Sequence, residues 1–221
     1  MDKRGRFITF EGTDGSGKST QIEKLAGALR SLHFEVLLTR EPGGTPIGES
    51  IRHTLLDSAT HGLCPRTELA LMFAARAQHL HEVILPALAA GHYVLCDRFT
   101  DSTEAYQGGG RELGSEIVLT LHRALCDNIQ PDLTILLDCD LTLSLARAQH
   151  RNLVTNAQGH ADENRFEQES RAFFSRVHEA FLAIAEREPK RVALIDARGT
   201  PVETHGKVLG VVRDRLHLSK I

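Results

Sequence analysis

The stretch Gly12-Thr13-Asp14-Gly15-Ser16-Gly17-Lys18-Ser19 decides the fold, because it fits the pattern G-x-x-x-x-G-K-[ST]. The apolar run 7–10 before it is typical of a short buried strand, and apolar residues at helical spacing follow it from 22 to 32. A glycine-rich loop between a strand and a helix turns successive backbone N–H groups into one concavity, where the helix N-terminus adds positive potential. Lys18 then reaches the β- and γ-phosphates of a nucleotide, and the Ser19 hydroxyl ligates Mg²⁺.

The stretch therefore predicts a P-loop that binds a nucleoside triphosphate. The residues expected to contact it are Gly12, Thr13, Asp14, Gly15, Ser16, Gly17, Lys18, Ser19 and Thr20. The loop alone does not say what is done with the nucleotide, because GTPases, motors, transporters and small-molecule kinases share it.

Length and composition exclude several classes of protein. With 221 residues, 41% of them hydrophobic and 25% charged, the chain has the make-up of one globular domain. Its net charge of −3 argues against a nucleic-acid-binding protein, which needs an excess of basic groups. No run approaches a membrane span, and four scattered cysteines without C-x-x-C are typical of reduced thiols in the cytosol. We therefore expect a cytoplasmic protein that binds neither nucleic acid nor membrane.

Apolar runs alternate with helical patterns along the rest of the chain. After the run at 7–10, the predicted strands cover 35–39, 93–96, 133–137 and 192–196. The predicted helices cover 45–55, 67–85, 116–126, 141–150, 167–187 and 202–216, and Pro86 is expected to kink the second of them. This alternation predicts an α/β, P-loop NTPase-type fold in three layers, with a parallel five-stranded sheet and helices on both faces.

Charged residues follow three of these strands. Arg40-Glu41 follows the second strand, Asp97-Arg98 the third and Asp138 the fourth. Ligands of parallel sheets bind outside the carboxyl ends of the strands, so we expect these groups beside the P-loop. Two arginines there suit a second phosphate that faces the γ-phosphate, and Asp97 can hold either the Arg98 guanidinium or a Mg²⁺-bound water.

Two further segments carry candidate ligand contacts. Three successive glycines at 108–110 predict a mobile or closely approached loop, which places Tyr106 near the site. The polar segment near 148–165 is flanked by arginines, and Arg147 and Arg151 share a helix face because they are four residues apart. It is either a solvated surface loop or a lid that closes over bound nucleotide and brings arginines to the phosphates.

Behind the P-loop, the motifs Arg40-Glu41-Pro42-Gly43-Gly44, Asp97-Arg98 and Ala105-Tyr106-Gln107-Gly108-Gly109 resemble those of the thymidylate kinase family. The likeness extends from about Phe7 to past Asp196, and the polar Asp14 is similar to the bacterial subgroup, whose lid carries arginines. The resemblance implies one nucleoside-monophosphate kinase domain over 1–221 with a lid near 148–165. It also implies transfer of phosphate from ATP to dTMP in dTTP biosynthesis, with Mg²⁺ accompanying ATP, by a homodimer.

The resemblance implies roles for the matching residues. Arg40 and Arg98 hold the dTMP phosphate, Arg76 donates to thymine O4, and Tyr106 packs against C2′ of the sugar. The full dTMP set is Asp14, Arg40, Pro42, Met72, Phe73, Arg76, Arg98, Thr103, Tyr106 and Gln107. The catalytic set is Lys18, Arg98 and Asp14 with a lid arginine among Arg147, Arg151 and Arg165, and the metal set is Ser19 and Asp97.

Spacing supports part of this set independently, since Met72, Phe73 and Arg76 lie within about one helical turn. An apolar stacking surface is thus placed beside a hydrogen-bond donor. Phe99 departs from the family pattern, in which Tyr or His usually follows Asp-Arg.

Two other functions remain as alternatives. A deoxynucleoside kinase shares the P-loop, but its hydroxyl acceptor needs a carboxylate base, for which Glu41 is the candidate. A phosphate acceptor needs no base, because the second pKa of a phosphate monoester is about 6. A GTP-dependent switch would need N-K-x-D after a late strand, and the sequence has none.

Overall fold

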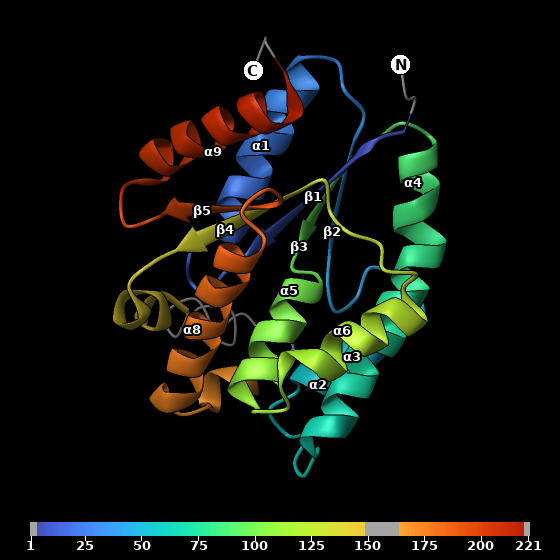
Figure 1. Cartoon of the computed structure of the whole chain (residues 1–221), viewed down its shortest axis with the longest axis vertical. Coiled ribbons are helices and arrows are strands. Elements are labelled where there is room, and N and C mark those ends of the chain that lie inside the picture. The colour runs from blue at the N-terminus through green and yellow to red at the C-terminus, as the bar shows by residue number, and fades with distance from the viewer. Residues whose placement is uncertain (1–3, 149–163, 219–221) are drawn as a thin grey trace.

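The computed structural model describes residues 4–148 and 164–218, which form a parallel sheet between two layers of helices (Figure 1). Its five described strands stand in the order β2-β3-β1-β4-β5, and all four pairings are parallel. Their bounds are β1 Arg6–Glu11, β2 Val36–Arg40, β3 Tyr93–Asp97, β4 Leu133–Asp138 and β5 Val192–Asp196. The predicted fold class is confirmed, and every predicted strand lies within a residue or two of its observed bounds.

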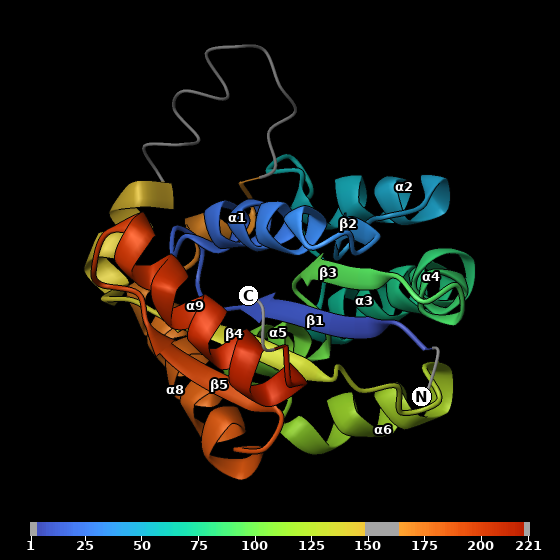
Figure 2. The same cartoon turned by 90° about the horizontal axis from the view of Figure 1, so that it is seen from above.

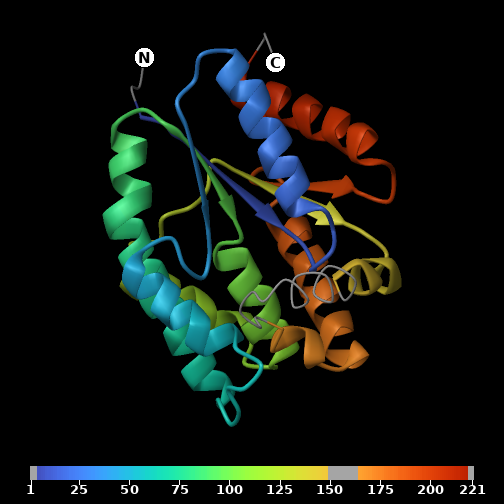
Figure 3. The ribbon, with the colours of Figure 1, turned by 180° about the vertical axis from the view of Figure 1, so that it is seen from behind.

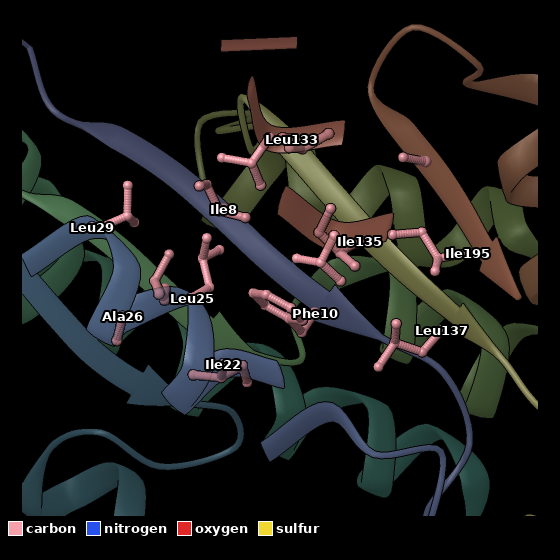
Figure 4. Packing of buried hydrophobic residues seen from close by; sticks show 14 of the residues in the cluster. Ile8, Phe10, Ile22, Leu25, Ala26, Leu29, Leu133, Ile135, Leu137 and Ile195 are labelled. Carbon is pink, nitrogen blue, oxygen red and sulfur yellow. The ribbon is translucent and has the colours of Figure 1, made fainter. Parts of the chain in front are cut away.

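The sheet is covered on both faces because successive side chains of β1 point in opposite directions. Ile8 and Phe10 pack against α1 (Lys18–Ser31) and α9 (Pro201–Leu216), as the close view of this core shows (Figure 4). Phe7 faces the opposite way, into a core with α3 (Pro65–His79), α4 (Leu85–Ala89) and α6 (Ser115–Leu125). Seen from above, α1 and α6 lie on opposite sides of the strands (Figure 2).

Helix ends are set by local capping. Thr45 caps α2 (Pro46–Leu56) by accepting a hydrogen bond from the Gly48 N–H at 2.9 Å. Ser170 caps α8 (Arg171–Arg187), so this helix begins four residues later than the predicted position 167, after a 3-10 turn at Phe166–Gln168. Thr200 and Glu203 form a reciprocal capping box at the start of α9. Helix α9 packs beside α1 on the same face of the sheet (Figure 3).

The predicted long helix around Pro86 consists of three joined segments. Helix α3 (Pro65–His79) passes into a π-helical segment, η1 (Leu80–Ile84), and then into α4 (Leu85–Ala89). Proline has no N–H to donate to the carbonyl four residues earlier, and a wider turn is a common way to absorb such a break. Pro86 therefore alters the helix, as predicted, without ending it.

The prediction of a loop at residues 108–110 is wrong. Helix α5 (Thr100–Thr103) continues into a π-helical segment, η2 (Glu104–Gly110), which packs against α8. A Cβ at Gly109 would lie 2.7 Å from that of Ala180, and one at Gly110 would lie 2.5 Å from the Phe173 ring. The close approach that we predicted is thus present, but two packed helices require the glycines, not a turn of the chain.

Candidate active site

A cavity of about 840 Å³ opens at the carboxyl ends of β1, β2 and β3. The P-loop forms one part of its wall, and the segments that follow β2 and β3 form another. Side chains from α3 and η2 line a further part of the wall, and Asn164, Phe166 and Glu167 reach the cavity from the segment before α8. The expectation that Arg40 and Arg98 lie beside the P-loop is confirmed, whereas Asp138 is not among the lining residues and accepts a hydrogen bond from His178 at 2.7 Å.

The P-loop has the shape that its glycines allow. Gly12, Gly15 and Gly17 all adopt positive φ, and a Cβ at Gly12 would lie 2.5 Å from the Leu137 carbonyl oxygen. Lys18 begins α1, and its ammonium group donates to the carbonyl oxygens of Gly12 at 3.0 Å and of Thr13 at 2.9 Å. Burial, with a smaller effect of Arg98, lowers the pKa of Lys18 to about 8.

Arg98 lies across the mouth of the loop. Its guanidinium donates to Asp14 Oδ1 at 2.8 Å, to the Gly12 carbonyl at 3.1 Å and to Ser102 Oγ at 2.8 Å. It also stacks on the Tyr106 ring, 4.9 Å from the ring centroid. Burial opposes its charge, but Asp14 and other acidic neighbours outweigh burial and keep the pKa of Arg98 well above its ordinary value. A permanent cation therefore faces the place where phosphates would meet.

Tyr106 contributes to both the cavity and the core. Its hydroxyl donates to Asp14 Oδ2 at 3.2 Å, and three phenylalanine rings pack edge-on around its own ring. Burial raises the pKa of Tyr106, so the phenol stays neutral and able to donate. Tyr106 thus lines the cavity, as expected, and also packs in the core.

Arg40 lines the cavity in a more open position than Arg98. Its side chain is 55% exposed and pairs with Glu49 at 3.0 Å. The guanidinium is thus partly hydrated and held by an exposed ion pair, which leaves it able to turn toward an incoming anion.

Arg76 lines the cavity as a buried side chain, and one of its nitrogens makes no hydrogen bond with the described residues. Its Nε donates to Glu41 at 2.7 Å and its Nη2 donates to Thr103 at 2.8 Å, while Nη1 is buried and finds no partner among the described residues. The guanidinium also lies between the Phe73 and Phe99 rings, 4.9 and 5.1 Å from their centroids. Because an unpaired buried N–H is unfavourable, this nitrogen is ready for an acceptor on a ligand.

The helix that carries Arg76 turns Met72 toward the cavity, whereas Phe73 is fully buried and does not line it. Phe73 belongs to the core beneath Arg76. Of the two residues expected to form the apolar stacking surface, only Met72 therefore lines the cavity.

The carboxamide of Gln107 meets the carboxylate of Glu68 beside Thr103. Gln107 donates from Nε2 to Glu68 at 2.8 Å, and its Oε1 is buried without a partner among the residues described. Both Gln107 and Thr103 line the cavity, as expected, and so does Pro42.

Ser19 and Asp97 form an oxygen-rich corner next to Lys18. The Ser19 hydroxyl donates to Asp97 Oδ2 at 3.4 Å, and Asp97 Oδ1 is buried and accepts no hydrogen bond from the described part of the chain. Hydroxyl and carboxylate oxygens are the ligands that Mg²⁺ prefers, so the residues at this corner fit that ion.

Glu11 lies beneath the site, and sequence analysis did not single it out. Its carboxyl group accepts the Phe99 N–H at 2.7 Å and also a hydrogen bond from Ser102, which in turn receives one from Arg98. Burial, assisted by Asp101, raises the pKa of Glu11 to about 8.

The three candidate lid arginines have different positions. Arg147 lines the cavity at the end of the helical residues 141–148. Arg165 does not line it, because its guanidinium donates to Glu68 at 2.7 Å and to the Leu55 carbonyl at 2.5 Å. Arg151, with most of the predicted lid, lies outside the described residues.

Residues 10–208 match the family model described as thymidylate kinase. The chain belongs to the thymidylate kinase family. It is 49% identical to the thymidylate kinase of Trichlorobacter lovleyi, over 95% of this chain and 98% of that one. It is 50% identical to that of Geobacter sulfurreducens, over 96% of this chain and 98% of the other. The crystal structure of thymidylate kinase from Ehrlichia chaffeensis superimposes with a TM-score of 0.74 at 34% identity, covering 95% of this chain and 99% of that one.

Sequence reasoning named Glu41 only as a charged strand-end residue and a candidate base, and it missed His79 and the contacts by which both support the site. Glu41 accepts hydrogen bonds from Arg76 and from His79 Nδ1, and His79 Nε2 contacts Thr39 at 2.6 Å. Although burial opposes it, Arg76 with His79 lowers the pKa of Glu41. The only local signal was that His79 follows Arg76 by three residues, which places both on one helix face.

Proposed function

We propose that this member of the thymidylate kinase family transfers the γ-phosphoryl group of ATP to dTMP, giving ADP and dTDP for dTTP biosynthesis. The observation that carries the proposal is one cavity lined by the P-loop, by Arg98, which is paired with Asp14 of that loop, and by Arg76, which keeps an unpaired buried donor. Its volume of about 840 Å³ lies in the upper part of the range of roughly 300–1,000 Å³ that is common for ligand pockets.

The base of dTMP is placed against Arg76 and Gln107. Arg76 Nη1 donates to thymine O4, and Gln107 Oε1 accepts from the N3–H. Cytosine offers an amino group and a bare N3 at these positions, so it would leave both protein groups unpaired. Met72 and Pro42 supply apolar contact with the ring, and Tyr106 packs near the sugar.

The acceptor phosphate lies between Arg98 and Arg40, facing the γ-phosphate held by Lys18. No general base is required, because the acceptor is ionised near neutral pH. The barrier is electrostatic, since two like unit charges about 4 Å apart repel by roughly 4 kcal/mol at an effective dielectric of 20. Lys18 and Arg98 offset this repulsion and stabilise charge on the transferring group, while Asp14 orients Arg98.

Ser19 and Asp97 would hold Mg²⁺, which supplies further positive charge to the β- and γ-phosphates when bound with ATP. The backbone N–H groups of the P-loop hold the same phosphates, from Gly12 to Thr20.

The segment near 148–165 is proposed as a lid that excludes water from ATP during transfer. Arg147 is the lid arginine best supported, because it already lines the cavity. Arg151 stays a prediction. Arg165 would first have to leave Glu68 before it could reach the phosphates.

Residues 1–221 are proposed to act as one kinase domain in a cytoplasmic homodimer that binds neither nucleic acid nor membrane. Four free cysteine thiols support the compartment, and the family resemblance supports the dimer. No helix among residues 4–148 and 164–218 is long and apolar enough to cross a membrane. Light scattering of the eluted protein tests the dimer directly.

The deciding experiment is an ADP-release assay with ATP, Mg²⁺ and a panel of nucleoside monophosphates. We expect turnover with dTMP, weaker turnover with dUMP, still weaker with UMP, and little with dCMP. Thymidine serves as the control for a deoxynucleoside kinase. Turnover of thymidine in place of dTMP would refute the proposal.

A further inference from the structure

A buried carboxylate, Glu68, stands behind the base end of the cavity without lining it. It belongs to the first turn of α3 and accepts hydrogen bonds from three side chains. Gln107 Nε2 lies 2.8 Å away, the Arg111 guanidinium binds both carboxylate oxygens at 3.1 Å, and Arg165 Nη2 is at 2.7 Å. Glu68 thus joins the amide of Gln107 to two arginines on the side away from the cavity.

Glu68 determines which end of the Gln107 amide faces a ligand. A carboxamide can present either an oxygen acceptor or an NH₂ donor, whereas a carboxylate offers only acceptors. The NH₂ end of Gln107 must therefore point at Glu68. The opposite end, Oε1, is buried and accepts no hydrogen bond from the residues described, although Gln107 itself lines the cavity. What Gln107 offers to the cavity is consequently an acceptor.

Glu68 itself is held in place. Arg111 also binds Glu169 at 2.6 Å, and Arg165 also binds the Leu55 carbonyl, so both guanidinium groups are fixed from more than one side. Gln107 is fully buried, and turning its amide would set its oxygen against the Glu68 carboxylate, acceptor to acceptor. The polarity of the amide is thus set by tertiary contacts and not by the ligand.

We propose that Glu68 is a positioning residue that makes the enzyme select pyrimidines with a protonated N3. Thymine and uracil carry an N3–H that the Gln107 oxygen can accept, whereas the bare N3 of cytosine would face that oxygen lone pair to lone pair. This inference rests on the proposed function, because it assumes that the base of the monophosphate lies against Gln107.

The test is Glu68→Gln, which replaces the carboxylate by an amide of the same shape that can donate or accept. Gln107 is then free to turn its NH₂ toward the cavity. The substrates are dTMP and 5-methyl-dCMP, which share the methyl group and differ at the base edge. We expect the ratio of their kcat/KM values to fall at least about tenfold, a loss of roughly 1.4 kcal/mol of discrimination.

Glu169→Gln is the matched control. It removes a carboxylate partner of the same Arg111 but does not contact Gln107, so the substrate ratio should stay within about twofold of wild type. In a Gln107→Leu background, Glu68→Gln should leave the ratio unchanged, because its effect acts through the amide. If Glu68→Gln lowers kcat/KM for both substrates by the same factor, Glu68 is only structural and the inference is wrong.

A measurement on the wild-type protein covers the case in which Glu68→Gln does not fold. The Gln107 side-chain NH₂ should contain a proton that exchanges slowly with solvent and keeps its NMR shift when dTMP binds. A fast-exchanging or strongly shifted NH₂ would place the nitrogen at the base and overturn the inference. Absence of dTMP turnover by the wild-type enzyme would instead reject the proposed function.

Discussion

Replacing Arg98 with alanine removes the cation that lies between the P-loop and the proposed acceptor phosphate. The guanidinium is only 16% exposed, so solvent screens its charge weakly compared with a surface arginine. At an effective dielectric of 20, one charge pair about 4 Å apart is worth roughly 4 kcal/mol. Losing a single donor to developing charge typically lowers kcat by about 10²–10³, or roughly 2.7–4 kcal/mol.

We therefore expect Arg98→Ala to lower kcat by at least about a hundredfold, with a smaller rise in KM for dTMP. The fold should survive, because Asp14 is 25% exposed and remains hydrated when its partner is lost. The backbone φ of 69° at this position is not made worse, since arginine and alanine both carry a Cβ.

The assay is ADP release at saturating ATP, with circular dichroism to confirm folding. Arg40→Ala is the comparison variant. Because Arg40 is half exposed and paired with Glu49, its loss should act more on KM than on kcat. A folded Arg98→Ala protein with near-normal kcat would remove Arg98 from the mechanism.

Three more perturbations test the buried groups. Lys18 has a pKa of about 8 in the free protein, so kcat/KM for ATP should fall as pH rises through 8, and a flat profile from pH 6 to 9.5 would contradict this. Arg76→Met should raise KM for dTMP about 10–100-fold. Because it also leaves Glu41 with fewer partners, it should lower the free energy of unfolding, measured by urea titration, by about 3–5 kcal/mol. The folded-state pKa of Glu11 is raised from 4.5 to about 8, so its contribution to stability is present below pH 4.5 and is lost as pH rises to 8. Glu11→Gln should abolish that loss, and equal slopes for both proteins at pH 5, 6.5 and 8 would show that Glu11 does not titrate in this window.

The fold was accessible from sequence because its central strands are buried on both faces. Continuous apolar runs such as 7–10 and 133–137 record that burial directly, and they match β1 and β4 closely. The P-loop could also be predicted from the sequence, because the backbone geometry that requires its glycines lies within one short segment. Polar residues at strand ends then placed Arg40 and Arg98 at one edge of the sheet.

The structural role of the glycines at 108–110 could not be predicted from the sequence. Glycine signals either a turn or a close helix contact, and only the packing of η2 against α8 decides between them. Phe73 and Met72 are neighbours with similar apolar character, and the orientation of α3 decides that Met72 faces the cavity. A local sequence pattern predicts which residues share a helix face, but it does not predict how the helix is rotated about its axis in the fold.

The sequence by itself determined the α/β class, the P-loop and most of the arginines that line the cavity, although it missed Arg52 and included Arg165, which does not line it. Tertiary structure alone decided how those groups are oriented. Glu41 reaches Arg76 across 35 residues, Glu68 reaches Gln107 across 39, and Asp14 reaches Arg98 across 84. The physical reason is that a hydrogen bond depends on distance and direction between atoms, and the crossover connections of a parallel sheet bring distant segments together in ways that residue spacing does not record.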